Sequence, residues 1–299
     1  MRNQNYGEKG NRLWFSVLSA GLTLLLLLVT LVSSHISLAA ISDDDFVDLC
    51  RYGSFEEVSE AIQHGANVNA MKISRIGSAL MGAAGSQISA PEKVALLLAQ
   101  GADLNFRPYE DDPNALYNAI SGDSDQKLKV VELLLEAGID ATYLSPGGAS
   151  FLDDAFFFAF KWTHEENAKL VELLLRVRES PEITFLTTYQ AACFGGPLSL
   201  DIILKATEDN DWINGRHDSG RTPLMCAARV NLYPESIVVL LKAGADMALK
   251  DNEGLTALDH AAQNKRGAAD EILAILRNPA AYLDETQNQR FIQRREGEK

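Results

Sequence analysis

The sequence predicts an all-α solenoid of about seven stacked helix-turn-helix units with short β-turn tips, and two observations lead to this prediction. An apolar helix that ends in a glycine-like stop recurs along the chain, with the stops at residues 65, 101, 138, 178, 207, 244 and 278. A shorter helix with small residues stands upstream of each of these apolar helices. Such recurrence is typical of a repeat array, in which a unit buries its apolar face only against its neighbours.

The longer helix is recognised by the spacing of its apolar residues. It reads VSEAIQHGANVN at 58–69, VALLLAQGADLN at 94–105, VELLLEAGIDAT at 131–142 and IVVLLKAGADMA at 237–248. Val131, Leu134 and Leu135 are spaced i, i+3 and i+4, which places them on one face of a helix. Glycines end these four helices, where a left-handed residue is favoured: Gly65, Gly101, Gly138 and Gly244.

The shorter helix carries a recognisable motif. It reads SALMGAA at 78–84, NALYNAI at 114–120, TPLMCAA at 222–228 and TALDHAA at 256–262. Thr222 can cap its helix while Pro223 occupies the first helical position, which needs no N–H donor. The alternation of the two helices resembles the ankyrin repeat, with its T-P-L-H-x-A-A helix followed by a V-x-L-L-L-x-x-G-A-D-V-N helix. The resemblance covers residues 42–278 and implies a protein-binding scaffold.

The resemblance divides the domain at 40–278 into units that differ in length. The approximate units are 42–69, 70–105, 106–142, 143–182, 183–213, 214–248 and 249–278. The unit at 143–182 is long and has VRESPE in place of the GAD turn, and the unit at 183–213 is short. Residues 279–299 are a polar C-terminal tail, interpreted as a frayed helix or disordered segment, with a short helical docking segment as the alternative.

The first 39 residues have the order of a secretory signal. A basic, polar start precedes an apolar run at 13–32, and Ser37 and Ala39 supply small residues before a cleavage point at Ala40. The apolar run is also long enough to span a bilayer, so a retained N-terminal membrane anchor is the alternative to a cleaved signal peptide, and a buried core helix is a third. Either leading alternative predicts an exported body, periplasmic, secreted or anchored outside the cytoplasm.

Composition narrows the classes of function. The net charge of −14 disfavours nucleic acid as a partner, and contact with a membrane is expected only through residues 13–32 if they are retained. Three widely spaced cysteines are interpreted as small buried residues, and the sequence offers no metal-binding motif and no cofactor motif. We find no catalytic set of residues, so the chain is predicted to be a non-enzymatic monomer; an enzyme that uses a pocket in the irregular region 143–213 is the competing hypothesis.

A protein partner of unknown identity is expected on the concave face formed by the turn tips and first helices. Aromatic and arginine side chains dominate many protein interfaces, and the tips supply several of them together with acidic residues and a histidine. The candidate partner-binding residues are Arg75, Arg107, Tyr109, Asp111, Tyr143, Trp212, Arg216, His217 and Asp251.

One further motif has two interpretations. The run FFFAFKW at 156–162 is rich in aromatic residues. These side chains either fill the core of the long unit or partly reach the surface and anchor a partner.

Overall fold

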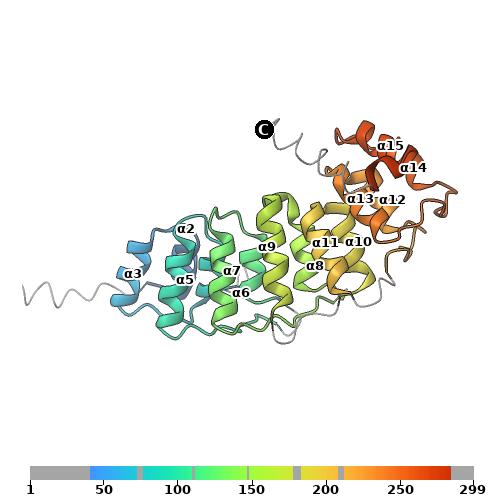
Figure 1. Cartoon of the computed structure of the whole chain (residues 1–299). Coiled ribbons are helices and arrows are strands. Elements are labelled where there is room, and N and C mark those ends of the chain that lie inside the picture. Colours follow the sequence, from blue (N-terminus) through green and yellow to red (C-terminus); the bar gives the residue numbers. More distant parts are fainter. Residues whose placement is uncertain are drawn as a thin grey trace, which may run out of the picture.

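The computed structural model describes residues 41–72, 77–109, 112–146, 148–177, 183–207 and 212–283. Within these ranges the chain forms seven helix pairs that follow one another along a single stack (Figure 1). The prediction of an all-α solenoid is confirmed. The signal or anchor segment at 1–39, its apolar run at 13–32 and the tail beyond Leu283 lie outside the described residues.

The first four pairs run from the N-terminal side to the middle of the stack. They are α2 (Asp43–Tyr52) with α3 (Phe55–Gln63), α4 (Ala79–Ala84) with α5 (Ala90–Ala99), α6 (Ala115–Ser121) with α7 (Lys127–Glu136), and α8 (Phe151–Phe157) with α9 (His164–Leu175). A short antiparallel pair, β1 (Met71–Lys72) and β2 (Gly77–Ser78), forms the tip before α4.

The last three pairs complete the stack. They are α10 (Phe185–Phe194) with α11 (Pro197–Ala206), α12 (Pro223–Val230) with α13 (Pro234–Lys242), and α14 (Ala257–Ala261) with α15 (Ala269–Arg277). A short helix, α16 (Ala280–Leu283), follows and contacts α13. Within the described ranges, no helix is both long and apolar enough to cross a membrane.

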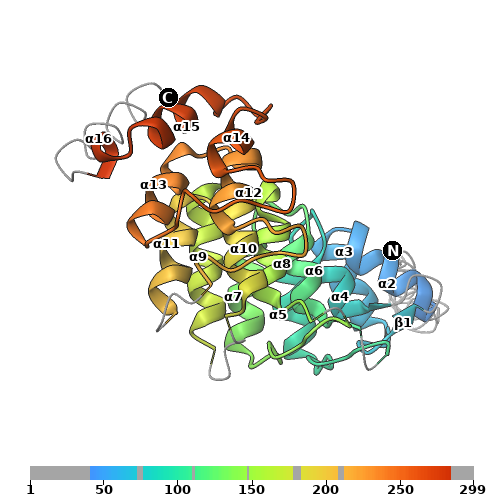
Figure 2. The same cartoon turned by 90° about the vertical axis from the view of Figure 1, so that its right-hand side faces the viewer.

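The helices form two parallel rows. Each first helix contacts the next first helix, in the order α2, α4, α6, α8, α10, α12 and α14. Each second helix contacts the next second helix, from α3 through α15 (Figures 1 and 2). Contacts between neighbours in both rows give one continuous core, which extends from Phe46 in the first unit to Leu276 in the last.

Helix ends form where the sequence predicts them. Thr222 accepts a hydrogen bond from the Met225 N–H, with Pro223 as the first helical residue. Ser42 caps α2 in the same way, through the Asp45 N–H. The four glycines that were expected to end second helices have φ between 85° and 94°, the left-handed region: Gly65, Gly101, Gly138 and Gly244.

Asparagines join the turn tips of consecutive units. Asn69 accepts a hydrogen bond from the Asp103 N–H at 2.7 Å and donates one to the Gly101 carbonyl at 3.3 Å. Asn214 makes both contacts again at the sixth helix pair, with the Asp246 N–H at 2.8 Å and the Gly244 carbonyl at 3.2 Å. These bonds use the backbone groups that the glycine turn exposes, so they set the spacing between adjacent tips.

The long fourth unit inserts a 3₁₀ turn, Ala159–Lys161, between α8 and α9. Phe156 and Trp162 lie at either end of this insertion and are buried. The Trp162 indole N–H donates to the Ile120 carbonyl at 3.2 Å, which ties the insertion to the preceding unit. Phe157 and Phe160, by contrast, are 59% and 78% exposed. The FFFAFKW run therefore both fills the core and reaches the surface, through different residues; the anchoring of a partner stays a prediction.

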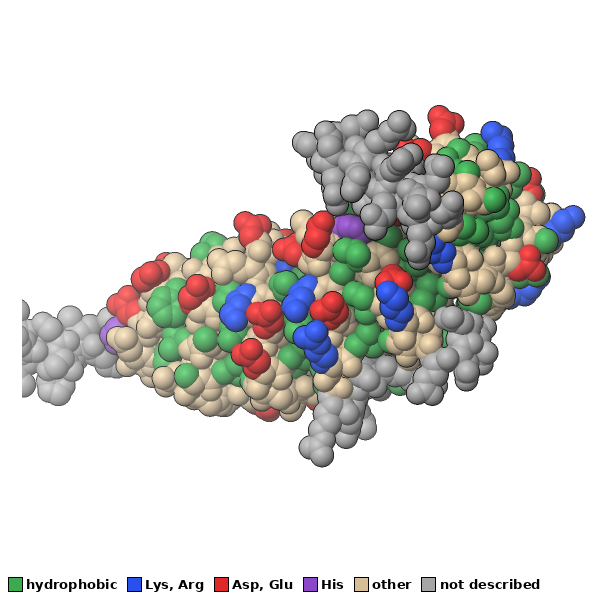
Figure 3. All heavy atoms as spheres, viewed as in Figure 1, with side chains coloured by type: hydrophobic (Ala, Val, Ile, Leu, Met, Phe, Trp, Pro, Cys, Tyr) green, Lys and Arg blue, Asp and Glu red, His purple; other side chains and the backbone are tan. Residues whose placement is uncertain are grey.

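The row of second helices presents a mixed charged face. Figure 3 shows acidic and basic side chains interspersed on this side of the molecule. Several form ion pairs one turn apart on a single helix, as in Lys169–Glu172 of α9 and Lys205–Asp201 of α11. Exposed pairs of this kind contribute little to stability. They give this face the character of an ordinary solvated surface.

Candidate functional site

Four aromatic rings gather at the tip between the fifth and sixth units. Tyr189 stacks on His217 with ring centroids 5.1 Å apart. Phe185 lies 5.5 Å from the Tyr189 ring and 6.4 Å from the Trp212 ring. We call this set, Phe185, Tyr189, Trp212 and His217, the tip cluster. Trp212 is 41% exposed and His217 is exposed as well, so the cluster is open to solvent.

Two elements position these rings. Thr184 caps α10 through the Thr187 N–H, and Phe185 and Tyr189 follow at positions i and i+4 on the same helix face. Trp212 and His217 come from the turn that precedes α12. Gly215 brings this turn close to α10, because a Cβ atom at that position would stand 2.5 Å from Cδ2 of Phe185.

Arginine side chains lie near Tyr189 and in the adjoining turn. Burial raises the pKa of Tyr189, and the positive charges of Arg221 and Arg229 act in the opposite direction. Arg216 donates to the carbonyls of Lys250 at 2.6 Å and Gly220 at 3.2 Å, so its guanidinium holds two turns together. This candidate residue therefore supports the shape of the tip next to the cluster.

Two other candidate residues have structural partners. The Arg107 guanidinium forms an ion pair with Asp140 at 2.5 Å and lies 5.3 Å from the centroid of the Tyr143 ring. Tyr143 is only 7% exposed and packs on Phe151. Hydrogen bonds from Thr142, together with Arg107, hold the pKa of the Asp140 carboxyl below its usual value against the opposing effect of burial. These contacts connect the third and fourth units.

Asp251 is also buried and serves the fold of its own tip. Its carboxylate accepts the N–H groups of Glu253 and Leu255, both at 2.9 Å, and contacts His260 Nε2 at 2.8 Å. These bonds lower the pKa of Asp251, although burial acts the other way. A partner could not reach this carboxylate without opening the turn.

The remaining candidates divide into one exposed residue and two that cannot be placed. Tyr109 is 66% exposed, in the tip between the second and third units. Arg75 and Asp111 lie outside the described residues. Among the candidates that can be placed, the structure brings Arg107 to Tyr143, and it gathers Trp212 and His217 in the tip cluster. It joins the latter two to Phe185 and Tyr189, which sequence reasoning missed. The sequence pattern that could have indicated these two residues is their i, i+4 spacing directly after the capping residue Thr184.

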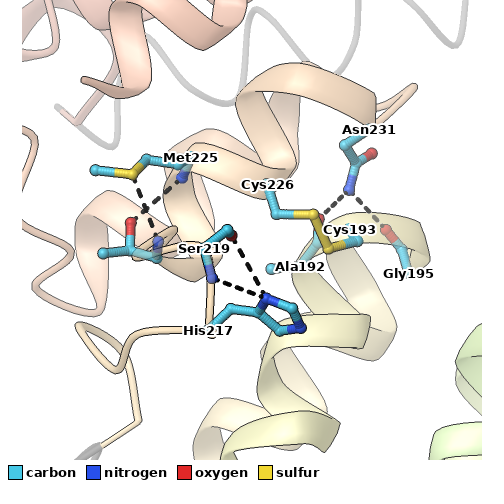
Figure 4. The surroundings of a disulfide bond; sticks show 9 residues. Ala192, Cys193, Gly195, His217, Ser219, Met225, Cys226 and Asn231 are labelled. Atoms are coloured by element: carbon cyan, nitrogen blue, oxygen red, sulfur yellow. Dashed lines mark hydrogen bonds between the residues drawn. A yellow bond between two sulfur atoms is a disulfide. The ribbon is translucent and has the colours of Figure 1, made fainter. Parts of the chain in front are cut away.

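All three cysteines are buried as expected, but the interpretation of them as separate small apolar residues was wrong for two of them. Cys193 of α10 and Cys226 of α12 form a disulfide, with their Cα atoms 5.2 Å apart (Figure 4). They are 33 residues apart in the sequence, with Cys193 near the end of α10 and Cys226 near the start of α12, so the bond links two adjacent first helices. Asn231 reinforces the same junction by donating to the carbonyls of Ala192 at 2.7 Å and Gly195 at 3.1 Å. Cys50 remains a free, buried thiol.

The histidines have local partners. His164 stacks on Tyr233 with ring centroids 5.0 Å apart. The Ser219 N–H donates a hydrogen bond to His217 Nδ1 at 3.5 Å within the same turn. Across the described ranges, the structure contains no group of three or more His, Cys, Asp or Glu side chains that could hold a metal ion.

Comparison with known proteins agrees with this geometry. The family model for ankyrin repeats (three copies) matches residues 165–286. The structure of the human ASB11 ankyrin repeat domain superposes with a TM-score of 0.55 at 26% identity, covering 78% of this chain and 96% of that one. The chain is an ankyrin-repeat protein. Ankyrin repeats form protein–protein interaction modules, and the fold is typically non-enzymatic.

A second solved structure is similar over a shorter span of this ankyrin-repeat protein. It is the Bd0816 predatory endopeptidase from Bdellovibrio bacteriovorus in complex with the immunity protein Bd3460. The match has a TM-score of 0.46 and 25% identity, and it covers 64% of this chain and 96% of that one. No curated protein sequence matches the chain.

Proposed function

We propose that this ankyrin-repeat protein acts as a scaffold outside the cytoplasm and binds a protein partner through the tip cluster. The observation that carries the proposal is the assembly of four rings from two units into one solvent-exposed group. Tyrosine, tryptophan and neighbouring arginine side chains supply much of the binding energy in protein interfaces. Among the described residues, the second-helix face carries ion pairs between interspersed acidic and basic side chains instead.

Two independent features support a location outside the cytoplasm. Residues 1–39 have the order of a secretory signal or anchor. The Cys193–Cys226 disulfide joins two units, and structural disulfides form and persist mainly in oxidising compartments. A cleaved signal would give a free periplasmic or secreted protein. A retained segment would give a membrane-tethered adaptor with the same binding surface.

The binding surface is tested by co-purification from envelope fractions, with the full-length chain as bait. We expect Tyr189→Ala combined with Trp212→Ala to reduce the recovery of a specific partner at least about tenfold, because truncated anchors typically lose 2 kcal/mol or more. Tyr109→Ala is the matched control, since it removes an exposed ring from another tip. Recovery that is unaffected by the double substitution would rule out the tip cluster as the binding surface.

The location is tested on protein recovered from the cells that produce it. N-terminal sequencing should find a mature start at Ala40 if the signal is removed, or an intact apolar segment if it is retained. Alkylation of the denatured protein, after rapid quenching, should modify Cys50 and leave Cys193 and Cys226 blocked until a reductant is added. Three free thiols in the quenched sample would contradict an oxidising location.

A further inference from the structure

An apolar groove lies at the opposite end of α10 from the tip cluster. Its lining comes from the ends of first helices and the connections that follow them: Phe157, Ala159, Phe160, Cys193, Phe194, Val230, Leu232, Tyr233 and Arg266. We call it the end groove. On α10, Phe194 of the groove is five residues from Tyr189 and nine from Phe185 of the tip cluster, which is about 7.5 Å and 13.5 Å along the helix axis. The end groove is therefore a second site, independent of the tip cluster.

The rings of the end groove are unusually exposed. Phe160 is 78% exposed, Phe157 59% and Phe194 42%, with Leu232 at 48% beside them. Single exposed apolar residues are common, but several that share one depression indicate a surface that is covered by another molecule. The exposure of these rings does not come from a loosely packed core, because Phe156 and Trp162 of the same run are buried.

The floor of the groove is held in place. Cys193 lines it and is bonded to Cys226 of the next first helix. Asn231 fixes the same junction through the Ala192 and Gly195 carbonyls. A preformed surface loses little entropy when it binds, which favours recognition of a short segment.

The charge of the groove limits what can bind there. Arg266 is the one charged residue in its lining, and the hydrogen bond found for this residue is made by its backbone N–H to Asn264. Among the described residues, no carboxylate forms an ion pair with its guanidinium. Lys265 precedes it, and Arg229 adjoins Val230 of the groove. A basic edge on a chain with net charge −14 is complementary to a carboxylate.

The size of the groove favours side chains of a peptide over a small molecule. Its volume is 280 Å³, below the roughly 300–1,000 Å³ of typical small-molecule pockets. We propose that the end groove binds a peptide segment of a partner protein that presents bulky apolar side chains next to a carboxylate. The apolar side chains contact the phenylalanines, and the carboxylate pairs with Arg266.

The proposal is tested by selecting random octapeptides, displayed on phage, against the full-length protein. Selected peptides should place Phe, Leu, Ile, Met or Trp next to Asp or Glu. Phe157→Ala combined with Phe160→Ala should weaken their binding at least about tenfold, since both anchors are lost. Both side chains are mainly exposed, so this variant is expected to fold, and circular dichroism verifies that it does.

A matched pair of substitutions isolates the charge. Arg266→Gln should remove the preference for Asp over Asn in the selected peptide, a change of about tenfold for a charge-assisted pair. Lys265→Gln removes a neighbouring positive charge outside the groove and should retain the preference. Trp212→Ala should leave peptide binding unchanged, so loss of the tip-cluster interaction and loss of this one are separate results.

Several outcomes would overturn the proposal. These are a failure to enrich any peptide, enrichment without acidic residues, or binding that survives the double phenylalanine substitution. Light scattering that finds a dimer of the wild type, lost in that variant, would assign the groove to self-association instead. Tighter peptide binding after Phe291→Ser would assign it to the chain's own C-terminal tail.

Discussion

At the scale of single residues, buried polar side chains fix the spacing between units and the shape of the turns. Asn231 and Asn264 are 33 residues apart and do the same thing at successive junctions, each donating to carbonyls of the preceding unit. A buried carbonyl without a donor is unfavourable, so each asparagine favours one spacing between units. Asp251 acts within a unit, where it organises its own turn.

Asp154 gives the protein a dependence on pH that can be predicted. Its carboxyl is mostly buried on α8, and burial with the neighbouring charge of Asp153 raises its pKa from 3.8 to about 7. Asp153 itself accepts hydrogen bonds from the Ser150 N–H and hydroxyl, at 2.7 and 2.8 Å. The pKa of Tyr117 is also raised, by burial and by Asp154. Ionisation of Asp154 is therefore unfavourable in the folded state.

The sign of the effect follows from linkage. Because the folded-state pKa of Asp154 exceeds 3.8, its contribution to stability is fully present below about pH 4 and is lost as the pH rises through about 7. We expect wild type to lose on the order of 2–4 kcal/mol more than Asp154→Asn between pH 4 and pH 8 in urea unfolding. Asp44→Asn, on an exposed site, is the control. Equal slopes for wild type and Asp154→Asn would contradict the assignment.

At the scale of elements, the turn tips fit against one another as closely as the helices do. The Asn252 N–H donates to the Ser219 carbonyl at 3.2 Å, and its side chain donates to the Asp218 carbonyl at 2.9 Å. Gly220 has a φ of 77°, and a Cβ there would stand 2.4 Å from Oδ1 of Asn252. The neighbouring tip therefore leaves no room for a side chain at this position.

Alanine substitutions at the equivalent glycines Gly220 and Gly254 distinguish the contribution of this packing to stability from that of backbone strain. Gly254 has a φ of 81° and nothing within 4 Å of its Cβ position. Gly254→Ala should lower the free energy of unfolding by about 1 kcal/mol through strain alone. Gly220→Ala should lower it by at least about 1 kcal/mol more, because the Asn252 contacts are also displaced. Chemical denaturation measures both, and equal losses would show that the tips do not pack this closely.

The disulfide between α10 and α12 should stabilise the stack. Cys193→Ala combined with Cys226→Ala should lower the free energy of unfolding by about 2–4 kcal/mol, the range for a cross-link over a loop of this length. A reductant should bring wild type down to the variant and leave the variant unchanged. Cys50 should not interfere, because burial raises its pKa to about 12 and thiolate is the reactive form. Equal stability with and without reductant would contradict a stabilising cross-link.

At the scale of the whole molecule, stability is a sum over neighbouring units. Each helix row is continuous, so an interior unit has two neighbours, whereas a terminal unit has one. The last pair is further weakened because α14 has only five residues. Opening should therefore begin at the ends of the stack.

Native-state hydrogen exchange measures this gradient. We expect amides of α6, α8 and α10 to exchange slowest, and those of α14 and α15 to exchange at least about tenfold faster. The disulfide should extend protection as far as α12, since it joins that helix to α10. Uniform protection along the chain would mean that the stack opens as one unit.

Much of the fold could be predicted from the sequence, because the same helix-forming and helix-ending residues recur in successive repeats. The positive φ at Gly65, Gly101, Gly138 and Gly244 follows from helix termination alone. The candidate site was harder to predict. Tyr143 and Asp251 are residue types that are common in exposed turns, yet both are buried. Tyr143 packs on Phe151 of the next helix, and Asp251 accepts hydrogen bonds from the backbone of its own turn.

The sequence by itself determined the repeat, the two helices of each unit and the residues that begin and end them, because these depend on spacing within about twelve residues. Tertiary structure decided the Cys193–Cys226 bond and the gathering of Phe185, Tyr189, Trp212 and His217. It also decided which phenylalanines of the 156–162 run reach solvent. The physical reason is that burial and ring contacts depend on the neighbouring unit, whose distance and rotation no single repeat encodes.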